Sequence, residues 1–265
     1  MSTLSVCIVT KNEARNIKAC LESVKFADEI IVIDSESTDN TVDICKQYTD
    51  KVYVEAWRGC GPQKKRATEL ASSEWILILD ADERLSVPLQ QEIQTKLQAP
   101  DADGYIIPFQ TFYLGKKIRF GDWLNEKHLR LFKRDNATVV PRLVHFRIDF
   151  QGQSKTLKHQ VMHYSFPTVE SIINKMNTYS TDGAIHKQAQ HKKAGLLTAI
   201  GHGAFAFIRG YILKLGFLDG VEGFLLAVSN AEGSYYRYLK LMYLNQRPEV
   251  VLPNAKYEHQ STPSS

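Results

Sequence analysis

Four short apolar segments recur within the first 80 residues, and an amphipathic stretch follows each of them. The segments read LSVCIVT, EIIVID, KVYVEAW and WILILD. Apolar runs of this length are typical of strands that are buried on both faces. The amphipathic stretches have apolar residues at helical spacing and span residues 14–24, 37–48, 61–71 and 87–98. Repeated β-α units predict an α/β fold in which helices flank a mostly parallel, Rossmann-like sheet.

The pattern changes after residue 104. Short strands and aromatic-rich loops run to about Phe166, which predicts mixed or antiparallel strands at the sheet edge. A helical pattern then continues to about Leu244, and the end of the chain contains several Pro and Ser residues. We therefore expect a catalytic domain at 1–168, a helical extension at 169–247 and a loose tail at 248–265.

Composition excludes some classes of protein. A formal charge of +4 in 265 residues suits an anionic small ligand or an anionic membrane, and is too small to indicate nucleic acid. The four cysteines show neither a C-x-x-C pair nor zinc-ligand spacing, which favours free thiols in a reducing compartment. The apolar tract Ala194–Ile208 has 15 residues, fewer than the ~20 that a membrane-spanning helix needs.

Three of the predicted strands end in polar, acidic sequences, namely TKNE, DSES and DADE. Ligands of such sheets bind beyond the carboxyl ends of the strands, so these three ends should share one site. Part of the second sequence has a structural explanation, because Thr38 or Asp39 is suited to cap the next helix. Three carboxylates within DADE repel one another unless a cation or a group of donors holds them. Two carboxylates together with diphosphate oxygens are a usual site for Mg²⁺ or Mn²⁺.

These segments also carry a resemblance. CIVTKNEARNI, IIVIDSESTDNT, GPQKKRA, WILILDADE, GDWLNEKHLRLFKR and LGFLDGVEGF resemble, in order and spacing, the family-two glycosyltransferases of GT-A fold. Within that family the chain is similar to the bacterial β-glucosyltransferases that extend the inner core of lipopolysaccharide. The resemblance implies a UDP-sugar donor, a lipid-linked saccharide acceptor, inversion at the anomeric carbon, and a location at the cytoplasmic face of the inner membrane.

The resemblance also implies roles for individual residues. The TKNE loop with Asp34 would hold the uracil and the ribose, and the D-x-D pair would hold the ribose and the metal. Lys64 or Lys65 would face the diphosphate, although a solvated helix face explains these lysines equally well. The nucleotide-sugar contacts expected on this basis are Thr10, Asn12, Glu13, Asp34, Ser35, Lys64 and Asp80, and the metal ligands are Asp80, Asp82 and His163.

The catalytic base is expected in GDWLNEKHLRLF. Relatives commonly have Pro-Asp where this chain has Asn125 and Glu126, so Glu126 is the first candidate and Asp122 the second. An ion pair of Glu126 with Lys127 or Arg130 is the structural alternative. Many relatives also have Glu where this chain has Phe146. Glu83 has no implied role, and it would orient Asp82 or a basic residue such as Arg84.

The region 202–244 is rich in Phe, Tyr and Leu with interspersed Arg and Lys, which is typical of helices at an anionic bilayer. Helices packed on the catalytic domain are the alternative. The hypothesis is a metal-dependent, inverting transferase that moves glucose from a UDP-sugar to a heptose of the lipopolysaccharide core. The alternatives are another lipid-linked or polysaccharide acceptor, or a non-catalytic protein that binds nucleotide sugars.

Other classes fit the sequence less well. A nucleotidyltransferase would need a Gly-rich loop after the first strand, and a haloacid-type phosphatase has its D-x-D there. A dinucleotide-binding oxidoreductase is disfavoured because GCGPQK lacks the third glycine. A glycoside hydrolase would need two opposed carboxylates and no nucleotide.

Overall fold

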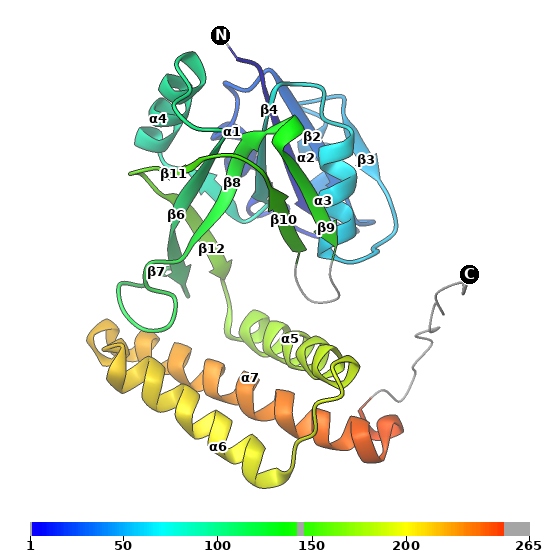
Figure 1. The fold of residues 1–265 in the computed structure, drawn as a ribbon, viewed down its shortest axis with the longest axis vertical. Coiled ribbons are helices and arrows are strands. Elements are labelled where there is room, and N and C mark those ends of the chain that lie inside the picture. Colours follow the sequence, from blue (N-terminus) through cyan, green and yellow to red (C-terminus); the bar gives the residue numbers. More distant parts are fainter. Residues whose placement is uncertain (1, 142–145, 252–265) are drawn as a thin grey trace. The chain divides into compact units, whose positions relative to one another are not determined.

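The structure, a computed structural model, describes residues 2–141 and 146–251, so residues 252–265 of the predicted tail lie outside it. Contacts divide the chain into two compact units (Figure 1). Unit 1 comprises Met1–Arg119 and Trp123–Thr168, and unit 2 comprises Phe120–Asp122 and Val169–Ser265.

Unit 1 is built on a large sheet with the strand order β3-β2-β1-β4-β8-β6-β12-β5, and β7 and β11 pair with β6. Strands β1, β2, β3 and β4 are parallel, while β8 runs antiparallel to both β4 and β6. The strand bounds are β1 (Leu4–Thr10), β2 (Glu29–Asp34), β3 (Val52–Val54), β4 (Trp75–Asp80), β5 (Glu83–Leu85), β6 (Gly104–Tyr113), β7 (Lys116–Lys117), β8 (Lys127–Lys133), β11 (Ser154–Thr156) and β12 (Val161–Phe166). This confirms the predicted α/β fold with a mixed edge. A separate two-stranded sheet pairs β9 (Ala137–Pro141) with β10 (Phe146–Phe150).

The central strands are apolar because helices cover both faces of the sheet. Every residue of β1 and β2 is buried. Alternate residues of β1 belong to two different cores, so Val6 and Ile8 lie on one face and Cys7 and Val9 on the other. Helices α1 (Ile17–Glu22) and α4 (Val87–Gln98) supply the first core, and α3 (Cys60–Glu69) contributes Ala67 to the second.

Two of the helices are shorter than the sequence pattern predicts. Helix α1 has six residues, and α2 (Thr41–Cys45) has five. The strand predicted over 51–57 is likewise reduced to β3. Asn40, and neither Thr38 nor Asp39, is the N-cap residue of α2, and its side chain makes no capping bond. The Asp39 carboxylate instead accepts hydrogen bonds from Thr41 and from the Ala14 amide. Side-chain contacts between the loops thus lie directly before both helices.

Unit 2 is helical. It contains α5 (Val169–Ala189), α6 (Leu196–Phe207), a π-helix at Ile208–Leu213, a 3₁₀ turn at Gly216–Asp219, α7 (Gly220–Gln246) and a 3₁₀ turn at Pro248–Val250. Helix α7 packs against both α5 and α6 (Figure 1). Lys240 on α7 donates to the Asn177 carbonyl oxygen and to Ser180 and Thr181 on α5, which fixes the register of these two helices.

Helix α6 and the π-helix together form a longer apolar stretch than the sequence tract indicates. In the described residues, Leu196–Leu213 is long and apolar enough to cross a membrane by length and composition, and 22% of it is buried. The core helix of a soluble protein passes the same test. The apolar helical segment is therefore longer than the 15-residue tract indicates, because the helix continues beyond Ile208.

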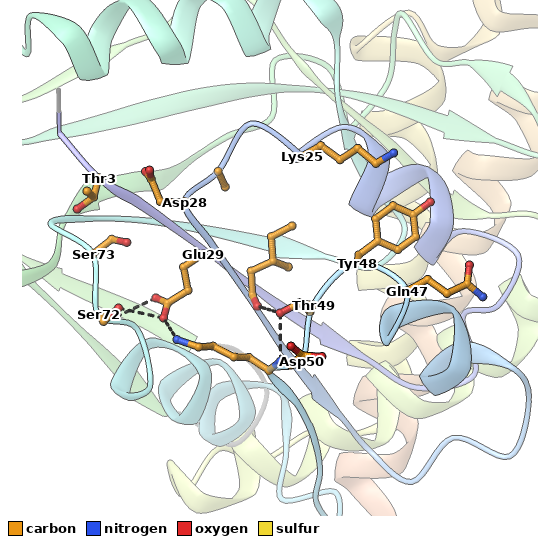
Figure 2. A pocket seen from close by; sticks show the side chains of 13 residues that line it. Thr3, Lys25, Asp28, Glu29, Gln47, Tyr48, Thr49, Asp50, Ser72 and Ser73 are labelled. Atoms are coloured by element: carbon orange, nitrogen blue, oxygen red, sulfur yellow. Dashed lines mark hydrogen bonds and ion pairs between the residues drawn. The ribbon is translucent and has the colours of Figure 1, made fainter.

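A buried carboxylate anchors the amino-terminal edge of the sheet. Glu29, the first residue of β2, accepts hydrogen bonds from the hydroxyl of Ser5, the amide and hydroxyl of Ser72 and the ammonium of Lys51. Glu29, Lys51 and Ser72 line a pocket of about 790 Å³ (Figure 2). Burial by itself would raise the pKa of Glu29, but these bonds outweigh it and lower the pKa to about 2.

The depressed pKa predicts an acid-dependent contribution to stability. Glu29 stabilises the fold fully above the ordinary glutamate pKa of 4.5, and this contribution is lost as pH falls toward 2. Glu29→Gln should therefore be less stable than wild type at pH 7. The difference in the free energy of unfolding between wild type and variant should narrow by about 1.4 kcal/mol between pH 7 and pH 3.5. This is the contribution of one pH unit, because pH 3.5 lies one unit below the ordinary glutamate pKa of 4.5. Urea unfolding at both pH values measures it. The control is Glu74→Gln, at an exposed side chain, and a difference that does not change with pH would contradict the assignment.

Candidate active site

The carboxyl ends of three parallel strands meet at one edge of the sheet in unit 1. In the strand register, Thr10 of β1 lies opposite Asp34 of β2, and Val9 lies opposite Asp80 of β4. The chain runs from β1 outward to β2 and β3 on one side and returns to β4 on the other side. This change of direction makes the crevice beside β1 a topological switch point, where open α/β sheets bind their ligands.

The loops after β1 and β2 hold each other in place. The Asn12 amide donates to the Ser37 hydroxyl at 2.7 Å, and the Asn12 side-chain oxygen accepts from the Thr38 amide at 2.8 Å. The Glu13 amide donates to the Thr41 hydroxyl at 2.8 Å. Asn12 has a φ of 53°, a conformation that Asn adopts more readily than most residues. The predicted nucleotide-binding loop is thus already ordered by its neighbour.

Asp34 and Ser35 lie at the base of these loops, and both are fully buried. The Asp34 carboxylate accepts from the Ser37 amide at 2.8 Å and from the Ser37 hydroxyl at 2.5 Å. Ser35 accepts from the Gln63 side chain at 3.1 Å. The Thr10 hydroxyl is buried without a hydrogen-bond partner among the residues that the structure describes. The residues predicted to contact the nucleotide therefore lie together at this edge.

Asp80 is held by two buried cations. The Lys64 ammonium lies 2.6 Å and 2.8 Å from the two carboxylate oxygens, and Arg130 Nη2 lies 3.4 Å from Oδ2. The side chains of Lys64 and Arg130 are 2% and 7% exposed, whereas that of Asp80 is 31% exposed. Burial by itself would raise the pKa of Asp80, but the two cations keep it well below its usual range. Lys64 is therefore no solvated helix residue, unlike Lys65, which is 44% exposed.

Glu83 completes this group, and its partners differ from those predicted. It accepts from Arg130 Nη2 at 2.8 Å with one oxygen and from the Asp80 amide at 2.9 Å with the other. These partners replace the predicted Asp82 and Arg84. Burial raises the pKa of Glu83, and the neighbouring Asp80 adds to this. We call Asp80, Lys64, Arg130 and Glu83 the Asp80 cluster.

Asp82 and His163 form a second pair beside this cluster. His163 Nε2 lies 3.5 Å from Asp82 Oδ2, and the Tyr164 amide donates to the Asp82 carbonyl oxygen at 2.9 Å. Pairing of β12 with β5 brings them together, because His163 lies opposite Glu83 in the register. Burial by itself would lower the pKa of His163, but the bond to Asp82 and the nearby charges of Asp82, Glu83 and Asp80 together outweigh this and raise the pKa. No group of three or more potential metal-ligating side chains occurs within residues 2–141 and 146–251.

Glu126 lies just before β8. Its carboxylate is 2.8 Å from His128 Nε2, and neither Lys127 nor Arg130 is its ion-pair partner. The bond to His128 lowers the pKa of Glu126, and charges on His163 and Arg130 lower it further, so Glu126 is ionised at neutral pH. Its backbone carbonyl accepts from the amide of Phe109, whose ring contacts both His128 and His163. Glu126 therefore belongs to the same region of unit 1 as the metal-ligand candidates.

Asp122, the second candidate base, belongs to unit 2. Its carboxylate binds Arg209 Nε and Nη2 at 2.9 Å and 2.8 Å, and Lys214 at 3.1 Å. Burial by itself would raise the pKa of Asp122, but these two cations lower it. The carboxylate is thus engaged by a bidentate arginine, which makes it a poorer proton acceptor than Glu126.

Sequence reasoning assigned no catalytic or binding role to Arg130. A charged residue among the apolar residues Leu129, Leu131 and Phe132 is the signal that could have identified it, because such a residue is buried only when it is paired. The partner could not be identified from the sequence, since the pairing of β8 with β4 brings residues about 50 positions apart into contact.

Comparison with known proteins agrees with this geometry. The family model described as glycosyl transferase family 2 matches residues 5–156. An uncharacterized glycosyltransferase of Rickettsia prowazekii is 32% identical over 97% of this chain and 92% of its own length. The lipopolysaccharide core biosynthesis glycosyltransferase LpsC of Rhizobium meliloti is 28% identical over 92% of each chain. The solved structure of S. aureus TarS 1–349 in complex with UDP aligns with a TM-score of 0.45 and 15% identity, covering 93% of this chain and 92% of that one.

The family match covers more than half of the chain, and the relative from Rickettsia extends it to nearly the whole length. The chain therefore belongs to glycosyl transferase family 2 and has the GT-A fold with a helical C-terminal region.

Proposed function

We propose that this protein transfers glucose from UDP-glucose to a heptose of the lipopolysaccharide inner core, with inversion at the anomeric carbon. The observation that carries the proposal is the convergence of Thr10, Asp34 and Asp80 at the switch point of the sheet. The similarity to LpsC, a glycosyltransferase of lipopolysaccharide core biosynthesis, supports the acceptor. The resemblance of the sequence motifs supports UDP as the nucleotide and glucose as the sugar.

Two groups of residues at this edge of the sheet would bind different parts of the nucleotide. The ordered loop at Asn12 and Glu13 would take the uracil, and Asp34 and Asp80 would take the ribose. The Thr10 hydroxyl, buried without a partner in the described chain, is an additional donor for a ligand oxygen. Ser35 supports this arrangement through its bond with Gln63.

Asp82 and His163 are the best-placed donors for Mg²⁺ or Mn²⁺. The Asp80 carboxylate is already paired with Lys64 and Arg130, whereas Asp82 faces the imidazole at 3.5 Å. One carboxylate and one imidazole leave room for diphosphate oxygens, which is how small divalent ions are commonly held. Such an ion would stabilise the negative charge of the leaving diphosphate.

Glu126 would act as the general base. The acceptor hydroxyl oxygen forms a bond to the anomeric carbon as the bond from that carbon to the diphosphate breaks, and UDP leaves. The hydroxyl proton passes to the Glu126 carboxylate, which is ionised at neutral pH and can accept it. His128, at 2.8 Å, holds the carboxylate in position. A single displacement of this kind inverts the anomeric carbon.

Unit 2 would bring the enzyme to an anionic membrane that carries the acceptor. Helix α6 and the segments after it expose large apolar side chains, among them Leu197 at 84%, Leu213 at 66% and Val221 at 69%. Lys192 and Lys193 are exposed immediately before α6. Apolar side chains with adjacent lysines suit the interface of a bilayer with anionic headgroups. We propose a cytoplasmic enzyme that is peripheral on the inner membrane.

The Asp82 assignment predicts a loss of metal-dependent nucleotide binding. Asp82→Asn keeps the size of the side chain but removes its charge, so UDP affinity in the presence of Mn²⁺ should fall at least tenfold. Calorimetry with and without Mn²⁺ measures this. Asp135→Asn, at a side chain that is 90% exposed, is the control. An Asp82→Asn variant that binds UDP and Mn²⁺ like wild type would exclude this role.

The Glu126 assignment predicts a selective loss of turnover. Glu126→Gln should lower kcat by about 10²- to 10⁴-fold, the usual contribution of a general base, and leave the UDP dissociation constant within about threefold. Turnover with UDP-, GDP- and dTDP-sugars is the measurement, and it also identifies the donor. If Asp122→Asn abolishes transfer while Glu126→Gln remains active, the base is Asp122.

The membrane assignment predicts that one added negative charge on α6 weakens the binding of the protein to lipid vesicles. Leu197→Glu should reduce binding to vesicles of phosphatidylethanolamine and phosphatidylglycerol at least threefold in a flotation assay. Asn174→Glu adds the same charge at an exposed polar position of α5 and is the control. Equal binding of the two variants, or no vesicle binding by wild type, would contradict the assignment.

A further inference from the structure

Aromatic rings cover the two cations of the Asp80 cluster. The Lys64 ammonium lies 4.4 Å from the centroid of the Phe146 ring, and the Arg130 guanidinium carbon lies 5.8 Å from the same centroid. The Phe109 ring is 5.2 Å from the Arg130 guanidinium carbon. A ring face stabilises a cation through its quadrupole and adds no opposing charge.

Two donor nitrogens of the cluster have no acceptor among the described residues. Arg130 Nη2 reaches Glu83 and Asp80, but Arg130 Nε and Nη1 are buried without a partner in the described part of the chain. Phe146 offers these donors no oxygen. Buried unpaired donors are costly, so their presence beside a candidate binding site needs an explanation.

The two cations also set the charge of the site. The two cations offset Asp80 and Glu83, and Asp82 is the next carboxylate along the chain. A nucleoside diphosphate brings further negative charge to the same edge. Carboxylates without these cations would repel it, and repulsion between charges a few ångströms apart is strong at a partly buried site.

We propose that Lys64 and Arg130 are positioning residues, which fix and neutralise Asp80 so that the edge accepts the donor diphosphate. Phe146 preserves this balance, because its ring covers both cations without adding a charge. The inference rests on the proposed function, since it assumes a nucleoside diphosphate at this edge.

A carboxylate at position 146 separates this role from a purely structural one. Glutamate there would lie against Lys64 and supply an acceptor to the unpaired donors of Arg130, so it should not destabilise the fold relative to glutamine. It would also compete with Asp80 for Lys64 and add negative charge. Stability and donor binding should therefore respond differently to the same substitution.

The test compares Phe146→Glu with Phe146→Gln, which have the same size and differ in charge. Thermal unfolding should give the Glu variant a Tm equal to or above that of the Gln variant. UDP titrated by calorimetry should bind the Glu variant at least tenfold more weakly than the Gln variant. The donor KM should rise by a similar factor, with kcat at saturation within about threefold.

Equal UDP affinity of the two variants, in a protein whose wild type binds UDP, would overturn the inference and leave the proposed function intact. A wild type that binds no nucleoside diphosphate would overturn both. If the Glu variant does not fold, Arg130→Lys and Arg130→Met make the same comparison, because their side chains are of similar length and only lysine is charged. Lysine should retain UDP binding at least tenfold better than methionine, and equal losses would overturn the inference.

Discussion

The pairing of Asp80 with Lys64 and Arg130 is the interaction on which the candidate site depends. It places an ionised carboxylate at the end of a buried strand, where an unpaired charge would be costly. The cations come from different parts of the fold, since Lys64 lies on α3 and Arg130 on β8. The carboxylate is therefore fixed only when a helix of one face and an antiparallel strand are both in place. Formation of the site is thus coupled to formation of the core of unit 1.

Asp80 and Asp82 were expected to hold a metal and the ribose of a nucleotide, and Glu83 had no implied role there. The structure adds that Asp80 is paired with Lys64, and Glu83 with Arg130, within the protein. Asp82 has His163 beside it and remains the carboxylate best placed for a metal. The Asp80 carboxylate is therefore neutralised by Lys64 and Arg130 within the folded chain itself.

Much of the fold was predictable because it depends on local periodicity. The apolar runs identified β1, β2 and β4, and the requirement that parallel strands share an edge brought Thr10, Asp34 and Asp80 together. The pairing of β8 with β4 was not predictable, because antiparallel insertion depends on contacts between distant residues. Arg130 and its bond to Glu83 were missed for this reason. The lengths of α1 and α2 were overestimated, because the apolar spacing continues beyond the residues that are helical in the structure.

The two edges of the sheet differ in how completely their buried polar groups are hydrogen-bonded within the chain. At the amino edge, the Glu29 carboxylate accepts hydrogen bonds from Ser5, Ser72 and Lys51. Glu29 lines a pocket of about 790 Å³, but its carboxylate is already hydrogen-bonded within the chain (Figure 2). At the carboxyl edge, Arg130 and Thr10 keep buried donors without partners among the described residues. A ligand gains little from a saturated carboxylate, whereas it can supply the oxygens that unpaired donors lack. The size of a pocket is therefore a poorer guide to this site than the hydrogen bonds that the folded chain leaves unmade.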